Sequence, residues 1–196
     1  RYRRGSSSTH PYELAMVRAA EWLGVALNLA YTYLYLQGTL PLAYVFAAAG
    51  GLAMGWACWH HRLQAETALH GFYIVMAGYG AWLASDASWA MTSHGWLWHA
   101  PAIALGLLTC VWVAPWLQKR GSAMPRLDAF TTVFSVMATW WMVQGDEVNW
   151  LYWIVIDSLS VYLYAKRGMP VGALLFVVYD LMAIDGWFDA VRWFSG

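Results

Sequence analysis

The sequence predicts an all-α integral membrane protein, with seven transmembrane helices in a 3+1+3 parallel-repeat arrangement. Three observations predict this fold. Only 11% of the 196 residues are charged and 61% are hydrophobic, whereas a soluble domain carries roughly 25% charged residues. The chain contains seven apolar stretches near the length of about 20 residues that a helix needs to cross a bilayer. The spacing of turns and basic loops in the first three stretches returns in the last three.

The same composition excludes several classes of protein. Disorder requires low hydrophobicity and high charge. Eleven Lys and Arg balanced by eleven Asp and Glu leave no basic excess for nucleic acid. Cys58 and Cys110 lie inside apolar stretches and are interpreted as core residues, outside any disulfide or metal framework. We therefore expect no nucleic-acid partner and no metal site.

Seven apolar runs define the predicted helices. The uncharged turn Gln37-Gly38-Thr39 joins the first run to the second, and the basic loop His60-His61-Arg62 joins the second to the third. The fourth run is apolar on all sides along Ala100–Trp116, the fifth is the shortest, and the seventh is the most polar. Trp and Tyr gather near the ends of the runs, where aromatic rings sit at the lipid headgroups. In order, the predicted helices are Leu14–Leu36, Leu40–Trp59, Ala65–Ala84, Trp96–Leu117, Ala129–Val143, Asn149–Ala165 and Val171–Phe188.

Basic residues are distributed very unevenly between the two ends of these helices. With seven spans, only Arg192 falls on the side that carries the acidic turn Gln144–Val148. The positive-inside rule then places the N-terminus in the cytoplasm and this turn outside, with Asp146 accessible from that side. The basic residues on the opposite side are Arg1, Arg3, Arg4, Arg18, Arg62, Lys119, Arg120, Arg126, Lys166 and Arg167.

The spacing of polar landmarks indicates an internal duplication within a single transmembrane domain, residues 1–196. Glu21 precedes Gln37-Gly38 by sixteen residues, and Asp128 precedes Gln144-Gly145 by the same number. Because one helix separates the two triplets, both have the same orientation in the membrane. We expect repeat one over about residues 14–84, a linker helix over about 96–117, and repeat two over about 129–188.

The segment that runs from Asn149-Trp150-Leu151-Tyr152-Trp153 through Asp157 to Tyr162–Met169 resembles the signature of the PnuC-type vitamin transporters. The resemblance covers most of Glu21–Trp187. It implies a three-plus-one-plus-three helix core similar to that of SWEET transporters, assembly as a homotrimer, and the bacterial inner (cytoplasmic) membrane as the location. It also implies uptake of nicotinamide riboside by facilitated diffusion, with trapping by a separate cytoplasmic kinase. Relatives carry thiamine or riboflavin. The resemblance also implies a transporter with no cofactor and no enzymatic activity.

Two features depart from that family's pattern. Family members often open the second helix with an Asn-Trp pair as well, but Leu42 and Ala43 stand at the equivalent positions here. Members of the family also place the turn before the Asn-Trp signature on the cytoplasmic side. The charge distribution of this chain places its Gln144–Val148 turn outside, and we keep that expectation.

Polar and aromatic side chains deep in the apolar runs are the candidate substrate-binding residues. Asn149, Trp153 and Asp157 share one helical face, and a carboxylate is costly in lipid, so this face should point into the bundle. An indole stacks on a flat cation such as the pyridinium of nicotinamide riboside or the thiazolium of thiamine. Amides and carboxylates bind the polar edges. The candidate set is Asn149, Trp150, Trp153, Asp157, Tyr73, Glu66, Gln144, Thr139, Tyr179 and Asp180.

Structural roles stay open for several of these side chains. Asn149 and Asp157 have the alternative of joining neighbouring helices, as polar residues in membranes often do. Thr139 has the alternative of bonding its own helix backbone. Glu66 lies near the end of its helix, where it is solvated or paired with Arg62 if it is not a ligand.

Other classes of membrane protein are weighed on the same residues. A retinal protein requires a lysine in the middle of a span, but Lys119 and Lys166 lie at helix ends. A membrane haem protein requires paired histidines at membrane depth. His70 and His99 are the histidines that lie far enough from the helix ends to be candidates. No phosphate-binding Walker loop is present, so ATP does not drive the cycle directly.

Overall fold

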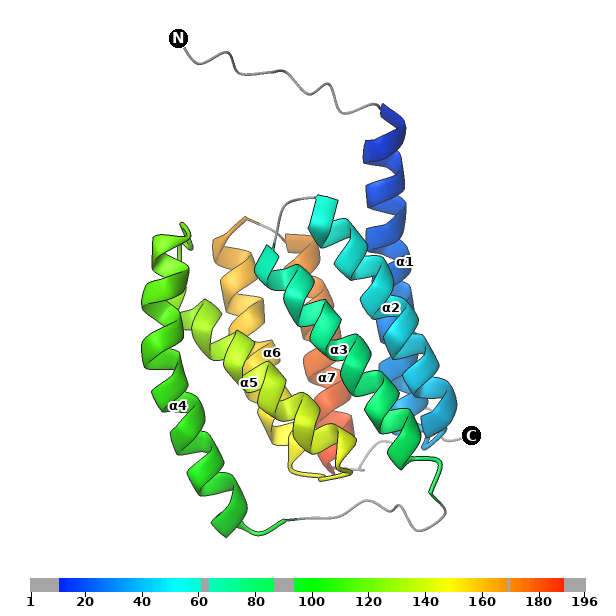
Figure 1. Ribbon diagram of the computed structural model, residues 1–196, viewed down its shortest axis with the longest axis vertical. Helices are drawn as coiled ribbons and strands as arrows, with labels where there is room; N and C mark the ends of the chain where they lie inside the picture. Colours follow the sequence, from blue (N-terminus) through cyan, green and yellow to red (C-terminus); the bar gives the residue numbers. More distant parts are fainter. Residues whose placement is uncertain (1–10, 61–63, 87–93, 169, 189–196) are drawn as a thin grey trace.

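The computed structural model describes residues 11–60, 64–86, 94–168 and 170–188, and α-helices fill most of this length (Figure 1). All seven predicted helices are confirmed, and each begins and ends within four residues of its predicted bounds. Of the basic residues counted above, Arg1, Arg3, Arg4, Arg62 and Arg192 lie outside the described residues. The helices are α1 Pro11–Leu36, α2 Leu40–His60, α3 Gln64–Leu83, α4 Trp96–Lys119, α5 Pro125–Val143, α6 Asn149–Lys166 and α7 Pro170–Phe188.

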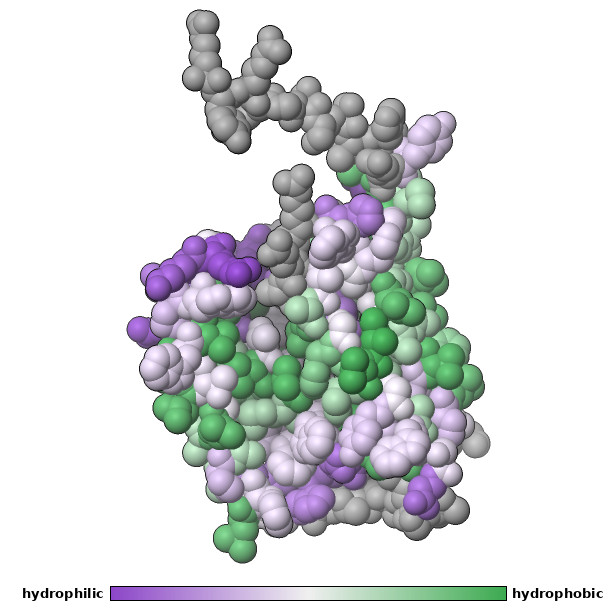
Figure 2. Space-filling model, in the orientation of Figure 1, coloured by the Kyte–Doolittle hydropathy of each residue, from purple (hydrophilic) through white to green (hydrophobic). Residues whose placement is uncertain are grey.

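The outer surface of the bundle is strongly apolar. Large hydrophobic side chains such as Leu52, Val75 and Trp112 are more than half exposed. Figure 2 shows an apolar band across the middle of the molecule, with the most hydrophilic surface at the upper left, where α4 ends in Figure 1. Two of the helices, α2 and α4, are long enough and apolar enough on their own to cross a membrane. This surface is the one expected where lipid is the solvent.

Six helices pack in a ring that follows the order of the chain. Contacts join α1 to α2, α2 to α3, α3 to α5, α5 to α6, α6 to α7, and α7 back to α1. The interfaces α3–α5 and α1–α7 are much smaller than those inside the triplets. Helix α4 packs on α5 at the edge of the bundle (Figure 1). The interior of the ring therefore lies between α1–α3 on one side and α5–α7 on the other.

The turns that lead into α2 and α6 begin with the same backbone geometry. In both, a glycine with a left-handed φ follows the glutamine, 70° at Gly38 and 75° at Gly145, which is a conformation that glycine adopts without steric cost. Three hydrogen bonds from backbone N–H to carbonyl recur 107 residues apart. They are Gln37 to Tyr33, Gly38 to Tyr35 and Thr39 to Leu34 in the first turn, and Gln144 to Trp140, Gly145 to Met142 and Asp146 to Trp141 in the second.

Each triplet also packs a buried aromatic ring on a glycine of its last helix. Trp150 of α6 lies on Gly186 of α7, where a Cβ would come within 2.5 Å of the ring. Tyr44 of α2 lies on Gly80 of α3, where a Cβ would meet the ring as closely. Ala43 holds the position equivalent to Trp150, so in the first triplet the aromatic contact comes from the next residue along the chain.

We expect substitution of either glycine to destabilise the bundle. Gly186→Ala and Gly80→Ala insert a methyl group into a filled contact, and such overpacking costs about 1–3 kcal/mol. The matched control is Gly78→Ala in α3, where nothing lies within 4 Å of the added Cβ; it should be neutral or stabilising. Melting temperatures of the purified variants in one detergent test this. Equal melting temperatures for all three would show that the aromatic–glycine contacts are not tightly packed.

Candidate functional site

One face of α6 carries polar and aromatic side chains into the buried part of the bundle. Asn149, Trp153 and Asp157 follow one another at four-residue spacing, which extends over about 12 Å along a helix axis. Asn149 is completely buried and Asp157 is 4% exposed. Trp153 is half-buried and contacts both apolar clusters of the core. We refer to these three side chains as the α6 face.

Two polar atoms of the α6 face are buried without a partner. The side-chain nitrogen of Asn149, Nδ2, donates to the backbone carbonyl of Asp146 at 2.6 Å. The amide oxygen Oδ1 of Asn149 and the indole nitrogen Nε1 of Trp153 have no hydrogen-bond partner among the described residues. A buried polar group without a partner is costly. The α6 face therefore offers one free acceptor and one free donor to a bound molecule.

Further polar groups gather around Asp157. Its carboxylate lies near enough to Tyr73 of α3, Tyr179 of α7 and Asp180 of α7 to interact with them electrostatically. Asp180 accepts a hydrogen bond on Oδ2 from the Ser158 hydroxyl at 2.9 Å, while its Oδ1 is buried and has no partner in the described part of the chain. Three of the predicted residues, Tyr73 on α3 and Tyr179 and Asp180 on α7, therefore lie within electrostatic range of Asp157.

Trp150 and Gln144 lie where the two triplets meet, at the end of the bundle that holds the α1–α2 and α5–α6 turns. The Tyr35 hydroxyl donates to the backbone carbonyl of Met142 at 2.7 Å, and the Tyr35 ring lies edge-on to Trp150 with centroids 5.7 Å apart. Gln144 donates from Nε2 to the Tyr79 hydroxyl at 3.3 Å. We name the group of aromatic side chains that brings α1, α2 and α3 together with α5 and α6 the aromatic closure. Its members are Tyr35, Tyr44, Tyr79, Trp140 and Trp150.

Two predicted residues have other surroundings. The Thr139 hydroxyl donates to the Ser135 carbonyl of its own helix at 2.8 Å, which is the packing role left open above. Glu66 is exposed in the first turn of α3. Neither side chain is among those that the structure gathers around the α6 face.

The acidic turn differs from expectation, because Asp146 is completely buried and only Glu147 is exposed. The Asp146 Oδ2 atom lies 2.6 Å from Nδ1 of His94 and 3.3 Å from Nε2 of His99. Asp146 is therefore not accessible from outside, since two imidazoles of the segment around the start of α4 cover it. The sequence holds one signal for this special environment, because Asp146 is charged while Thr39, at the equivalent position of the first triplet, is neutral.

The surroundings of His99 also bear on the haem alternative. Its Nε2 faces Asp146, and its Nδ1 lies 3.1 Å from the Tyr152 hydroxyl. The ring is 1% exposed. Both ring nitrogens therefore lie beside protein groups, and Nε2 forms no hydrogen bond among the described residues.

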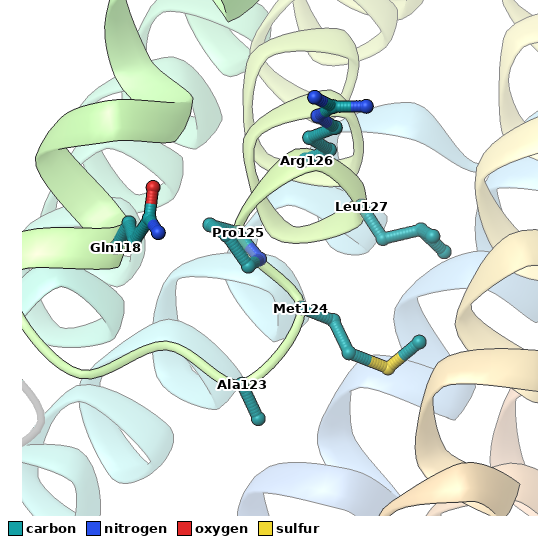
Figure 3. A pocket seen from close by; sticks show the side chains of 6 residues that line it. All are labelled: Gln118, Ala123, Met124, Pro125, Arg126 and Leu127. Atoms are coloured by element: carbon teal, nitrogen blue, oxygen red, sulfur yellow. The ribbon is translucent and has the colours of Figure 1, made fainter.

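Two hollows on the surface lie apart from the predicted residues. One, of about 350 Å³, is bounded by α3, α4 and α5. The other, of about 380 Å³, lies at the α4–α5 connection, and Figure 3 shows Gln118 across it from Pro125. The first is lined by Phe72, Ala102, Val136, Met137, Trp140 and Trp141. The second is lined by Gln118, Ala123, Met124, Pro125, Arg126 and Leu127.

Comparisons with known proteins agree on one family. Residues 18–194 match the family model described as nicotinamide mononucleotide transporter. The chain is 32% identical over 116 residues to the nicotinamide riboside transporter PnuC of Neisseria mucosa, which covers 55% of the chain and 43% of that protein. It is 30% identical over 100 residues to the nicotinamide riboside transporter PnuC of Haemophilus influenzae, and this match covers 51% of the chain and 42% of that protein. The chain thus aligns with less than half the length of these relatives.

A solved structure shares the fold. The crystal structure of the vitamin B3 transporter PnuC superposes with a TM-score of 0.64 at 16% sequence identity, and the match covers 94% of this chain and 85% of that one. At this identity the likeness concerns the fold alone.

Proposed function

The chain belongs to the nicotinamide mononucleotide transporter family, the family of the PnuC proteins, and we propose that this multi-pass membrane protein transports nicotinamide riboside. The proposal depends on one observation beyond family membership. The α6 face presents an indole, a free amide oxygen and a carboxylate in the buried interior between the two triplets. The curated relatives named above are nicotinamide riboside transporters.

Nicotinamide riboside fits these groups chemically. Its pyridinium ring stacks on Trp153, an interaction worth roughly 0.5–2 kcal/mol for a desolvated cation. The carboxylates of Asp157 and Asp180 complement the positive charge. The free oxygen of Asn149 accepts a hydrogen bond from the ligand, and the hydroxyls of Tyr73 and Tyr179 serve the ribose. The unpaired buried atoms described above support this assignment, because a ligand would pair them.

The charges of the surrounding helices favour the riboside over its phosphorylated form. Helices α3 and α7 contain no Lys or Arg, and the single basic residues of α5 and α6, Arg126 and Lys166, lie at helix ends. A phosphate would therefore lack a cationic partner at depth. The transport step is facilitated diffusion, and a separate cytoplasmic kinase traps the vitamin inside the cell.

We further propose that the helices form two parallel repeats in a 3+1+3, SWEET-like arrangement, with α4 as the linker. The matching turns before α2 and α6 and the paired aromatic–glycine contacts support it. The location is the bacterial inner membrane, with the α5–α6 turn outside. Assembly as a homotrimer is proposed on the family relationship.

Thiamine is the second candidate substrate, because its thiazolium is also a flat cation that the same indole and carboxylates would accept. Riboflavin, the third vitamin named in the sequence analysis, has no such positive charge. Titration of the purified protein with nicotinamide riboside, thiamine and riboflavin separates the three. We expect the tightest binding for nicotinamide riboside, and tighter binding of either other vitamin would reassign the substrate.

Trp153→Ala should weaken binding of nicotinamide riboside about 10-fold or more, because it removes a stacking contact worth roughly 1–3 kcal/mol. Trp153→Phe should recover part of the loss, since a smaller aromatic face remains. The matched control is Trp112→Ala, which removes an indole that is 77% exposed on α4, and it should bind normally. Affinity and melting temperature are measured on the same preparation. Normal affinity in Trp153→Ala would remove Trp153 from the site.

Orientation is tested at Glu147, which is exposed in the α5–α6 turn, whereas Asp146 is too buried to label. In a background with Cys58 and Cys110 replaced by Ala, Glu147→Cys should react with an impermeant thiol reagent in intact cells. Lys166→Cys, exposed at the other end of α6, should react only after lysis. The reverse pattern would place the basic end of the bundle outside.

A further inference from the structure

Asp146 is a fully buried carboxylate that is held from two sides. Its Oδ1 accepts a hydrogen bond from the backbone N–H of Val148 at 2.9 Å. Its Oδ2 faces Nδ1 of His94 at 2.6 Å, the backbone N–H of His94 at 3.2 Å and Nε2 of His99 at 3.3 Å. Burial of a carboxylate is costly unless it is paired and hydrogen-bonded. The segment around the start of α4 supplies the partners of Oδ2, through two hydrogen bonds from His94 and the ion-pair distance to His99, whose Nε2 forms no hydrogen bond among the described residues.

Asp146 in turn sets the orientation of Asn149. Its backbone carbonyl accepts hydrogen bonds from the backbone N–H of Asn149 at 3.0 Å and from the side-chain Nδ2 at 2.6 Å. Because a carbonyl oxygen only accepts, the nitrogen of the Asn149 amide must face it. The amide oxygen is thereby left for a bound molecule. The acceptor on the α6 face thus depends on the position of Asp146.

The equivalent turn of the first triplet forms without such a connection. Thr39 holds the place of Asp146, and its hydroxyl donates to the Leu34 carbonyl of its own turn at 2.9 Å. The two turns share three backbone hydrogen bonds and then differ: the Thr39 carbonyl accepts from the N–H of Ala43, four residues on, whereas the Asp146 carbonyl accepts from the N–H of Asn149, three residues on. The contacts of Asp146 to His94 and His99 are therefore not needed for the glycine turn that both triplets share, and they accompany the different backbone hydrogen bonds that lead into α6.

We propose that Asp146 is a positioning residue through which His94 and His99 hold Asn149, so that the α4 linker sets the affinity of the α6 face. This inference deepens the proposed function and rests on Asn149 as a ligand-binding residue. The connection runs from α4, outside the six-helix ring, to the first turn of α6. The ring of Trp141 covers it, with centroids 5.7 Å from His94 and 4.7 Å from His99.

A double-mutant cycle tests the connection. Nicotinamide riboside is titrated into the wild-type protein, His94→Ala, Asn149→Ala and the double variant. Loss of one positioning hydrogen bond should weaken binding about 3- to 10-fold in the wild-type background. In the Asn149→Ala background the same change should have an effect of less than about 2-fold, because the residue being positioned is gone. His94→Gln, whose amide also donates to Oδ2, should recover most of the affinity.

The control is His60→Ala, since the exposed His60 contacts the carbonyl of Trp56 in its own helix at the other end of the bundle. It should leave the affinity unchanged. An equal effect of His94→Ala in both backgrounds, or no effect in the wild type, would overturn the proposal.

Hydrogen exchange gives a readout that needs no ligand. His94→Ala should accelerate exchange of the amides at residues 148–151, while residues 41–44 at the equivalent turn keep their rate. Unchanged exchange at 148–151 would overturn the positioning role. If the wild-type protein binds none of the three vitamins, the proposed function fails, and the exchange experiment still decides whether His94 holds the turn.

Discussion

A strongly polar side chain inside an apolar bundle is stable only where other polar groups surround it. This constraint determines which way the α6 face points, and with it the position of the candidate site. Asn149 and Asp157 would meet lipid if the α6 face pointed outward. They point instead into the ring, where Tyr73, Tyr179 and the Asp146 carbonyl lie near them. The position of the site therefore follows from the cost of placing the polar face of α6 anywhere else.

The two triplets have similar turns and differ in side chains, and the difference concentrates the candidate binding residues in the second one. Both turns share three backbone hydrogen bonds, and both triplets pack an aromatic ring on a glycine. Leu42 and Thr39, however, stand where the second triplet has Asn149 and Asp146. The first triplet therefore contributes mainly Tyr73 and the three tyrosines of the aromatic closure, while the α6 face of the second supplies the indole and the amide.

The sequence predicts the helices well because each apolar run ends at a turn, a glycine or a charged loop, which are local signals. It also predicts that Asn149, Trp153 and Asp157 share one face, because helical periodicity decides that. The pairing of His94 with Asp146 is beyond such reasoning, since the two residues are 52 positions apart and meet only when α4 packs on α5. The sequence also does not predict that Tyr44 packs on Gly80. The 107-residue spacing makes Ala43 the equivalent of Trp150, and only the packing of α2 on α3 shows that the next residue, Tyr44, makes the contact.

The sizes of the helix interfaces indicate where the bundle would open for transport. The α1–α2, α2–α3 and α6–α7 interfaces are extensive, whereas α3–α5 and α1–α7, which join the triplets, are small. Each triplet therefore moves most easily as a unit, and the break falls between them. The aromatic closure crosses that break through the hydrogen bond from Tyr35 to Met142 and the Tyr35–Trp150 contact. Opening this end of the ring thus requires the loss of a few specific contacts, while the α6 face and its connection to α4 stay together on one side.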